Sequence, residues 1–193
     1  MSMNLFYEEY PTSIEIDGNE IQIITDFRSY IQLLDMLKDD DLSSNEKYQL
    51  LLQYFKEQPS DFSQAMDALI DFVTMKELPK CGVQEDGEIE ENDVNKKELY
   101  SFSIDYPFII SAFLQDYGIN LREIKYMHWW EFCMLFDGLS EDTEIRKRIM
   151  YRNMNLNNIK DKDERTRVEK IQRLIRLPGN EPSDFDIGDA FGW

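Results

Sequence analysis

The feature that most constrains this chain is a stretch of eleven residues, from Tyr126 to Phe136, that is apolar almost all round a helix. It contains two tryptophans, two phenylalanines and two methionines, and Glu131 is its one charged residue. A helix without a polar face is buried on several sides, so other elements must pack around it. The stretch therefore predicts an aromatic-rich helix over residues 120–138, at the core of a mostly helical protein.

A β-hairpin is predicted on the N-terminal side of the chain. Isoleucines alternate with polar residues over 14–24, and the turn sequence Asp17-Gly18-Asn19 lies between the two halves. A two-stranded hairpin alone is marginally stable, so we expect it to pack against helices or to pair with another strand. Three helices with N-terminal capping residues are predicted to follow it, beginning after Asp26, Ser43 and Asp61.

The C-terminal side predicts four helices, the aromatic helix among them. One begins near Asp105 and ends at Gly118, and another begins at Ser140 or Asp142. The last begins at Asp161 and is predicted to turn four aliphatic side chains inwards: Val168, Ile171, Leu174 and Ile175. The fold class is therefore mostly α, of the α+β type, with an N-terminal β-hairpin followed by about seven helices.

A break in composition divides these two groups of elements. Residues 81–98 hold seven acidic residues and three aliphatic ones, which indicates an acidic loop or hinge over 80–98. We predict a hairpin plus three helices over 1–79, a C-terminal helical half over 99–179, and an acidic tail over 180–193. The two halves could equally form one domain.

The net charge of −18 is unevenly distributed, because residues 146–177 hold eleven basic residues and four acidic ones. A body this acidic repels phosphate, and the chain has no apolar run long enough to span a bilayer, so we expect no nucleic-acid or membrane partner. The basic helix could neutralise the acidic body or bind an acidic partner. Candidate protein-binding residues on this helix and the tail are Lys162, Arg165, Lys170, Arg173, Arg176, Phe185, Phe191 and Trp193.

Nothing in the sequence indicates catalysis, a metal or a cofactor. It has no nucleotide-binding glycine motif, no nucleophile-elbow motif and one histidine, so we expect a protein that is not an enzyme and holds no cofactor. His128 and Cys133 stand five residues apart, a spacing at which helical side chains do not face each other. Trp129 and Trp130 could anchor a partner, but the prediction is a structural core formed by His128, Trp129, Trp130, Phe132 and Phe136.

Two groups of residues around the aromatic helix carry a resemblance to a known family. They are the run Tyr117-Gly118-Ile119-Asn120-Leu121 and the run His128-Trp129-Trp130-Glu131-Phe132. With Thr25-Asp26-Phe27-Arg28 after the hairpin, they resemble the phage "Gp-fifteen" family over most of residues 14–177. Asn120 stands where an acidic residue is expected in the family pattern.

The resemblance implies a small protein of tailed phages and prophages of Gram-positive bacteria, encoded beside the tape-measure protein of a long non-contractile tail. It implies a non-catalytic tail-assembly chaperone in the host bacterial cytoplasm. Its partners would be the tape-measure protein and other tail-assembly proteins. Weak, repeated binding along a long rod gains from multivalency, so self-association would also be useful. Two other functions stay open: a minor structural tail or connector component of the virion, and an acidic phage protein that binds and inhibits a host DNA-binding protein.

Overall fold

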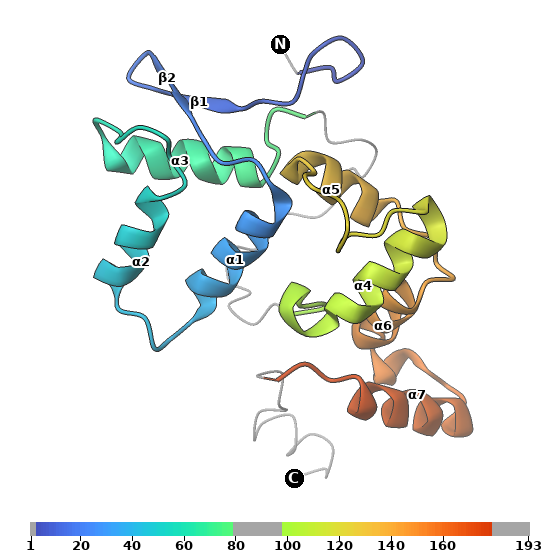
Figure 1. Ribbon diagram of the computed structural model, residues 1–193. Coiled ribbons are helices and arrows are strands. Elements are labelled where there is room, and N and C mark those ends of the chain that lie inside the picture. The colour runs from blue at the N-terminus through green and yellow to red at the C-terminus, as the bar shows by residue number, and fades with distance from the viewer. Residues whose placement is uncertain (1–2, 79–97, 179–193) are drawn as a thin grey trace. The chain divides into compact units, whose positions relative to one another are not determined.

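The computed structural model of the protein describes residues 3–78 and 98–178 (Figure 1). In these ranges a β-hairpin is followed by seven α-helices, which confirms the mostly α fold class. Two compact units are present: unit 1 takes the described residues of Met1–Glu88 and Glu123–Gly138, and unit 2 those of Ile89–Arg122 and Leu139–Trp193. Each predicted half was one continuous stretch of the chain. Unit 1 instead combines the N-terminal half with residues 123–138, which were predicted to belong to the C-terminal half. The acidic tail, and the acidic loop except for Glu98, lie outside the described residues.

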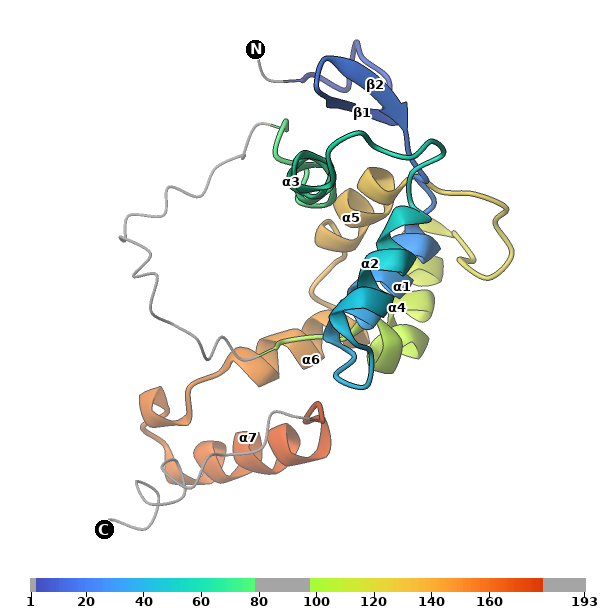
Figure 2. The same cartoon turned by 90° about the vertical axis from the view of Figure 1, so that its left-hand side faces the viewer.

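The hairpin belongs to unit 1 and consists of β1 (Ser13–Ile16) and β2 (Asn19–Gln22). The strands are antiparallel, with Ile16 opposite Asn19 at the turn. Asp17 and Gly18 have φ values of 51° and 76°, and a two-residue hairpin turn of this kind needs both angles to be positive. The isoleucines at 16, 21 and 23 are buried, and β1 packs on α3 (Phe62–Val73), as Figure 2 shows. The hairpin is therefore stabilised by a helix, as its sequence requires.

The other helices of the N-terminal half are α1 (Phe27–Lys38) and α2 (Ser44–Leu52). All three predicted helix starts are right, because each capping side chain accepts a hydrogen bond from a backbone N–H two or three residues later. Asp26 accepts from Arg28, Ser43 from Glu46 and Asp61 from Gln64. Ser43 and Glu46 form the reciprocal capping box.

The aromatic helix, α5 (Trp129–Asp137), is shorter than the predicted 120–138. His128 precedes it with an extended backbone, and the imidazole Nδ1 of His128 accepts the N–H of Trp130 at 3.0 Å, which makes His128 the N-cap. Residues 123–127 form turn and irregular backbone, and the Arg28 guanidinium on α1 donates to the Ile124 carbonyl at 2.7 Å. The five residues predicted as structural core are all buried: His128, Trp129, Trp130, Phe132 and Phe136.

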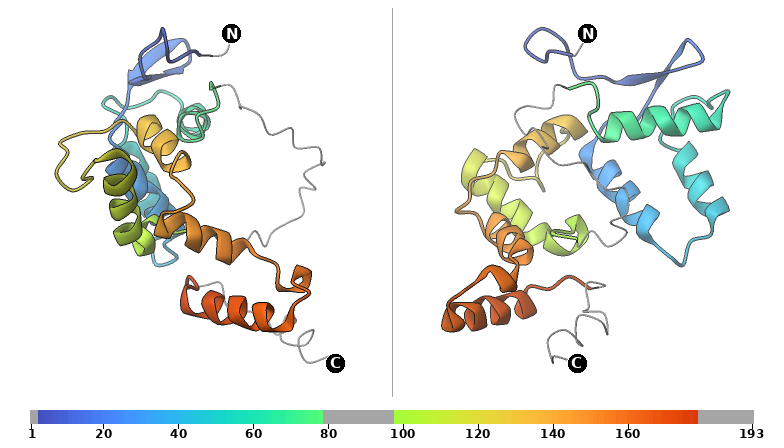
Figure 3. Two further views of the ribbon diagram at one scale, coloured as in Figure 1. Left: turned by 90° about the vertical axis from the view of Figure 1, so that its right-hand side faces the viewer. Right: turned by 180° about the vertical axis from the view of Figure 1, so that it is seen from behind.

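Unit 2 contains α4 (Phe102–Tyr117), α6 (Glu144–Asn153), the short 3₁₀ helix η1 (Leu156–Asn158) and α7 (Lys162–Leu174) (Figure 3). α4 begins three residues before the predicted Asp105 and ends at Gly118, whose φ of 69° is the left-handed value that favours glycine. α6 begins after Thr143, slightly later than predicted. α7 begins at the predicted cap, because the Asp161 carboxylate accepts the N–H of Glu164 at 2.7 Å.

A buried ion pair joins the elements of unit 2. The Arg152 guanidinium on α6 forms two parallel hydrogen bonds to the Asp105 carboxylate on α4, at 2.6 and 2.9 Å. The same guanidinium donates to the carbonyls of Leu99, before α4, and Ile175, after α7. The Asp105 side chain is 1% exposed and that of Arg152 is 4% exposed. One side chain on α6 thus fixes α4 and the end of α7 in one arrangement.

Candidate protein-binding surface

The inner face of α7 is held to the end of α6. Val168 is buried, and the Gln172 amide donates to the carbonyls of Tyr151 and Met154, each at 2.7 Å. The prediction that Leu174 also turns inwards is wrong, because its side chain is 85% exposed. Six residues separate Leu174 from Val168, which places it about 120° round the helix from the buried side.

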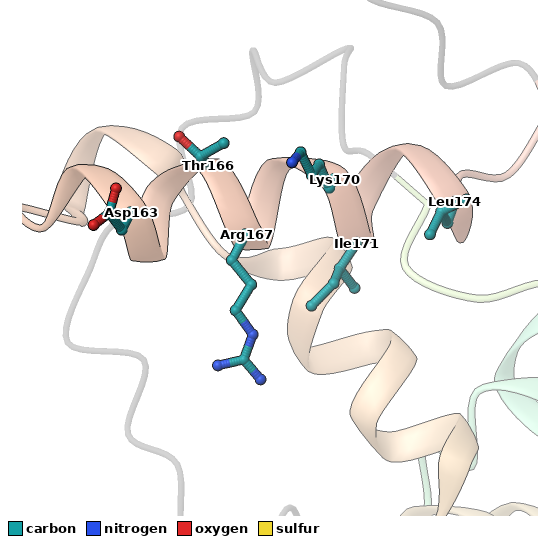
Figure 4. Close-up of a pocket in the computed structure, with 6 residues that line it drawn as sticks. All are labelled: Asp163, Thr166, Arg167, Lys170, Ile171 and Leu174. Atoms are coloured by element: carbon teal, nitrogen blue, oxygen red, sulfur yellow. The ribbon is translucent and has the colours of Figure 1, made fainter.

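The exposed side of α7 carries a surface hollow lined by residues three and four positions apart. Figure 4 shows these side chains, with Arg167 and Ile171 projecting to the same side of the helix. We call this surface the α7 stripe, and its residues are Asp163, Thr166, Arg167, Lys170, Ile171 and Leu174. It combines two cations with an almost fully exposed leucine.

The predicted basic residues do not coincide with this stripe. All five are exposed, but Lys170 alone lines the hollow. Lys162, Arg165 and Arg173 lie on the other flank of α7, Arg176 follows the helix, and Arg173 forms an ion pair with Glu169 at 2.6 Å. Sequence reasoning missed Arg167, although its spacing from Asp163 and Lys170 was the available signal. The predicted tail residues, Phe185, Phe191 and Trp193, lie outside the described residues.

A second exposed surface lies on α4, and it carries no charge. We call it the α4 face, and its residues are Ser103, Ile104, Pro107, Ser111 and Leu114, all exposed. The two charged residues of α4 bond to other parts of unit 2 instead. Asp105 pairs with Arg152, and the Asp116 carboxylate accepts the backbone N–H of Ser140 at 2.7 Å and its hydroxyl at 3.1 Å. An uncharged helix face is unusual in a chain with 31% charged residues.

Unit 1 presents two exposed aromatic side chains, Phe6 and Tyr7, on an ordered turn. The Asn4 carbonyl accepts the N–H groups of Tyr7 and Glu8 at 3.0 Å, and the Asn4 side chain accepts that of Phe6. The sequence gives no signal for this exposed pair, because two adjacent aromatic residues among polar ones show neither helical nor strand periodicity. Exposed aromatics of this kind are common anchors at protein interfaces.

The His128 and Cys133 side chains are not arranged for catalysis. His128 is buried, and since its Nδ1 accepts the Trp130 N–H, its Nε2 carries the proton and donates to the Pro11 carbonyl at 2.9 Å. Burial lowers the pKa of His128 and raises that of the Cys133 thiol, which keeps the sulfur protonated rather than nucleophilic. The His128 imidazole is therefore used in hydrogen bonds within the fold, and the Cys133 thiol is held in its neutral form.

Trp129 and Trp130 pack inside unit 1 and do not form an exposed anchor. Their indole N–H groups donate to the carbonyls of Val73 and Phe72, at 3.0 and 2.7 Å, at the end of α3. Over residues 3–78 and 98–178, no three His, Cys, Asp or Glu side chains lie where they could share a metal ion. Over the same ranges, no helix combines the length and apolar character that crossing a membrane requires.

Comparison with known protein families gives a match over most of the chain. The model of the family described as "Bacteriophage Gp15 protein" matches residues 6–177, which is most of the chain. The protein therefore belongs to this bacteriophage family, as its sequence resemblance predicted. No curated protein and no solved structure matches the chain.

Proposed function

We propose that this phage protein is a non-catalytic chaperone of tail assembly, which binds the tape-measure protein while a long non-contractile tail is built. The observation that carries the proposal is the α4 face, an exposed and uncharged helix surface on a strongly acidic chain. Its partners would be the tape-measure protein and other tail-assembly proteins in the host cytoplasm, with self-association increasing its avidity for a long client.

Before assembly, a tape-measure protein needs a partner that keeps it soluble. A long helical rod with an apolar stripe aggregates unless that stripe is covered, and a complementary apolar helix face covers it. The α4 face offers Ile104 and Leu114, whose side chains are 48% and 52% exposed, without a charge that would have to lose its water on binding. The net charge of −18 then keeps the complex soluble.

The size of the effect follows from the exposed area. Full burial of an aliphatic side chain contributes roughly 1.5–3 kcal/mol, so covering the exposed half of one contributes about 1 kcal/mol. Losing both Ile104 and Leu114 should cost about 2 kcal/mol of binding free energy, or roughly a 30-fold weaker complex.

The test is co-expression with the tape-measure protein of the same phage, followed by size-exclusion chromatography with light scattering. We expect co-elution of several copies with a soluble tape measure, and the Ile104→Gln, Leu114→Gln double variant should lose most of it. The matched control is Leu37→Gln with Ile70→Gln in unit 1, which changes the same residue types at 44% and 53% exposure.

Three outcomes separate the functions. Co-elution that is lost in the α4 variant and retained in the control supports the proposal. Separate elution of the protein while the tape measure precipitates refutes it. A fixed number of copies in purified virions would identify a structural tail component instead.

A further inference from the structure

The α7 stripe is a candidate docking surface separate from the α4 face. It places Arg167 and Lys170 in the middle of an exposed surface, with Ile171 and Leu174 towards the C-terminal end. Arg167 pairs only loosely with Glu164, at 3.6 Å with both side chains largely exposed. The complementary ligand is an acidic segment that carries an apolar side chain between its acids.

A second copy of the same stripe is a poor ligand for it. Two copies packed antiparallel about the centre of the stripe would bring the Arg167 and Lys170 of one copy against those of the other. Like charges at this spacing repel, so symmetrical pairing through α7 is disfavoured. The ligand must therefore differ from the stripe in sequence and in charge.

The sequence supplies such a segment directly after α7. Residues 180–193 contain four acidic residues and no basic one, and Phe185 stands between Asp184 and Asp186. The described chain ends at Pro178, four residues after the last residue of α7, and Leu177 is buried. The seven steps along the chain from Pro178 to Phe185 can span at most about 23 Å, whereas Leu174 and Arg167 are about 11 Å apart along the helix.

We infer that the α7 stripe is the docking site for the acidic C-terminal tail of the same chain. Asp184 and Asp186 face Arg167 and Lys170, and Phe185 covers the exposed Leu174. This inference concerns α7 alone, so it does not depend on the tape-measure proposal for the α4 face.

The test is limited proteolysis of the full-length protein with chymotrypsin, followed by intact mass. The rate of cleavage after Phe185 reports the undocked fraction of the tail when docking is fast, and a free peptide of residues 178–193 gives the undocked rate. We expect the full chain to be cleaved about tenfold more slowly than the peptide, since tethering gives the tail a millimolar effective concentration.

Charge reversal on the stripe identifies the site. Arg167→Glu with Lys170→Glu should raise the rate of cleavage after Phe185 to within about twofold of the rate for the free peptide. Adding Asp184→Lys with Asp186→Lys should slow cleavage again, relative to a peptide that carries the same two tail changes. The matched control, Arg165→Glu with Arg173→Glu, makes the same charge change on the other flank of α7 and should keep the slow rate.

Each remaining outcome overturns the inference. Cleavage of the unmodified chain at the peptide rate means that no docking occurs. An equal loss of protection in the control means that charge in general, not the stripe, slows cleavage. Protection that disappears on about hundredfold dilution means that the tail binds another copy.

Discussion

Removing one partner of the Asp105–Arg152 pair should destabilise unit 2 far more than a surface ion pair would. Both side chains are almost fully buried, and the guanidinium makes four hydrogen bonds, two to Asp105 and one each to the carbonyls of Leu99 and Ile175. Asp105→Asn leaves a buried guanidinium without its counter-charge, which typically costs about 3–5 kcal/mol. Arg152→Met should cost more, because it leaves a buried carboxylate and also removes the donor to two carbonyls.

The double variant separates the pair energy from the cost of a stranded charge. Asp105→Leu with Arg152→Met removes both charges, and an apolar replacement of a buried pair is often close to neutral. The loss of the donor to Leu99 and Ile175 remains, so we expect about 2 kcal/mol of destabilisation. The double variant should therefore be at least about 2 kcal/mol more stable than the sum of the single changes Asp105→Leu and Arg152→Met.

Urea unfolding followed by two signals tests this. In a Trp193→Phe background, tryptophan fluorescence reports Trp129 and Trp130 in unit 1, while far-ultraviolet circular dichroism reports all helices. We expect part of the helical signal to be lost at lower urea in Asp105→Asn. The matched control is Glu144→Gln, which breaks the more exposed i,i+4 pair with Arg148 and should cost below about 1 kcal/mol. An Asp105→Asn protein as stable as this control, or additive changes in the double variant, would refute the reasoning.

Two further predictions concern His128 and Gly118. Burial lowers the pKa of folded His128, so the unfolded chain binds a proton first and stability should fall as pH drops below about 6.5. His128→Asn, which can still cap α5, should lose this part of the pH dependence. The measurement is the unfolding free energy from urea titrations at successive pH values. If the free energy of the variant falls with pH as steeply as that of the unmodified protein, His128 is not the group responsible. Gly118→Ala should lower the unfolding free energy by about 1–2 kcal/mol, because the φ of 69° is strained for alanine although an added Cβ meets no other atom. Gly118→Asn should cost less, since asparagine tolerates this backbone conformation better. Equal costs for the two variants would argue against a backbone origin.

The parts of the fold that the sequence predicted depend on short-range interactions. Asp26, Ser43, Asp61 and Asp161 were placed correctly because a capping side chain bonds to a backbone N–H two or three residues away. The start of α5 was not predicted, because the stretch before it is held by a contact from distant Arg28 to the carbonyl of Ile124. Apolar periodicity alone extends a helix through such a segment.

The α4 face was harder to predict from the sequence, because on this helix a charged residue is buried and two aliphatic residues are exposed. Apolar residues lie on the outer side of this helix as well as on its inner side, so apolar periodicity alone does not mark Ile104 and Leu114 as exposed. In the structure the charged residue Asp105 lies on the buried face with Ile109 and Phe113, because Arg152, 47 residues away, neutralises it. The aliphatic residues Ile104 and Leu114 are exposed. The ion pair therefore stabilises a charged residue on the inner side of α4, whereas the surface proposed to bind the client lies on its outer side.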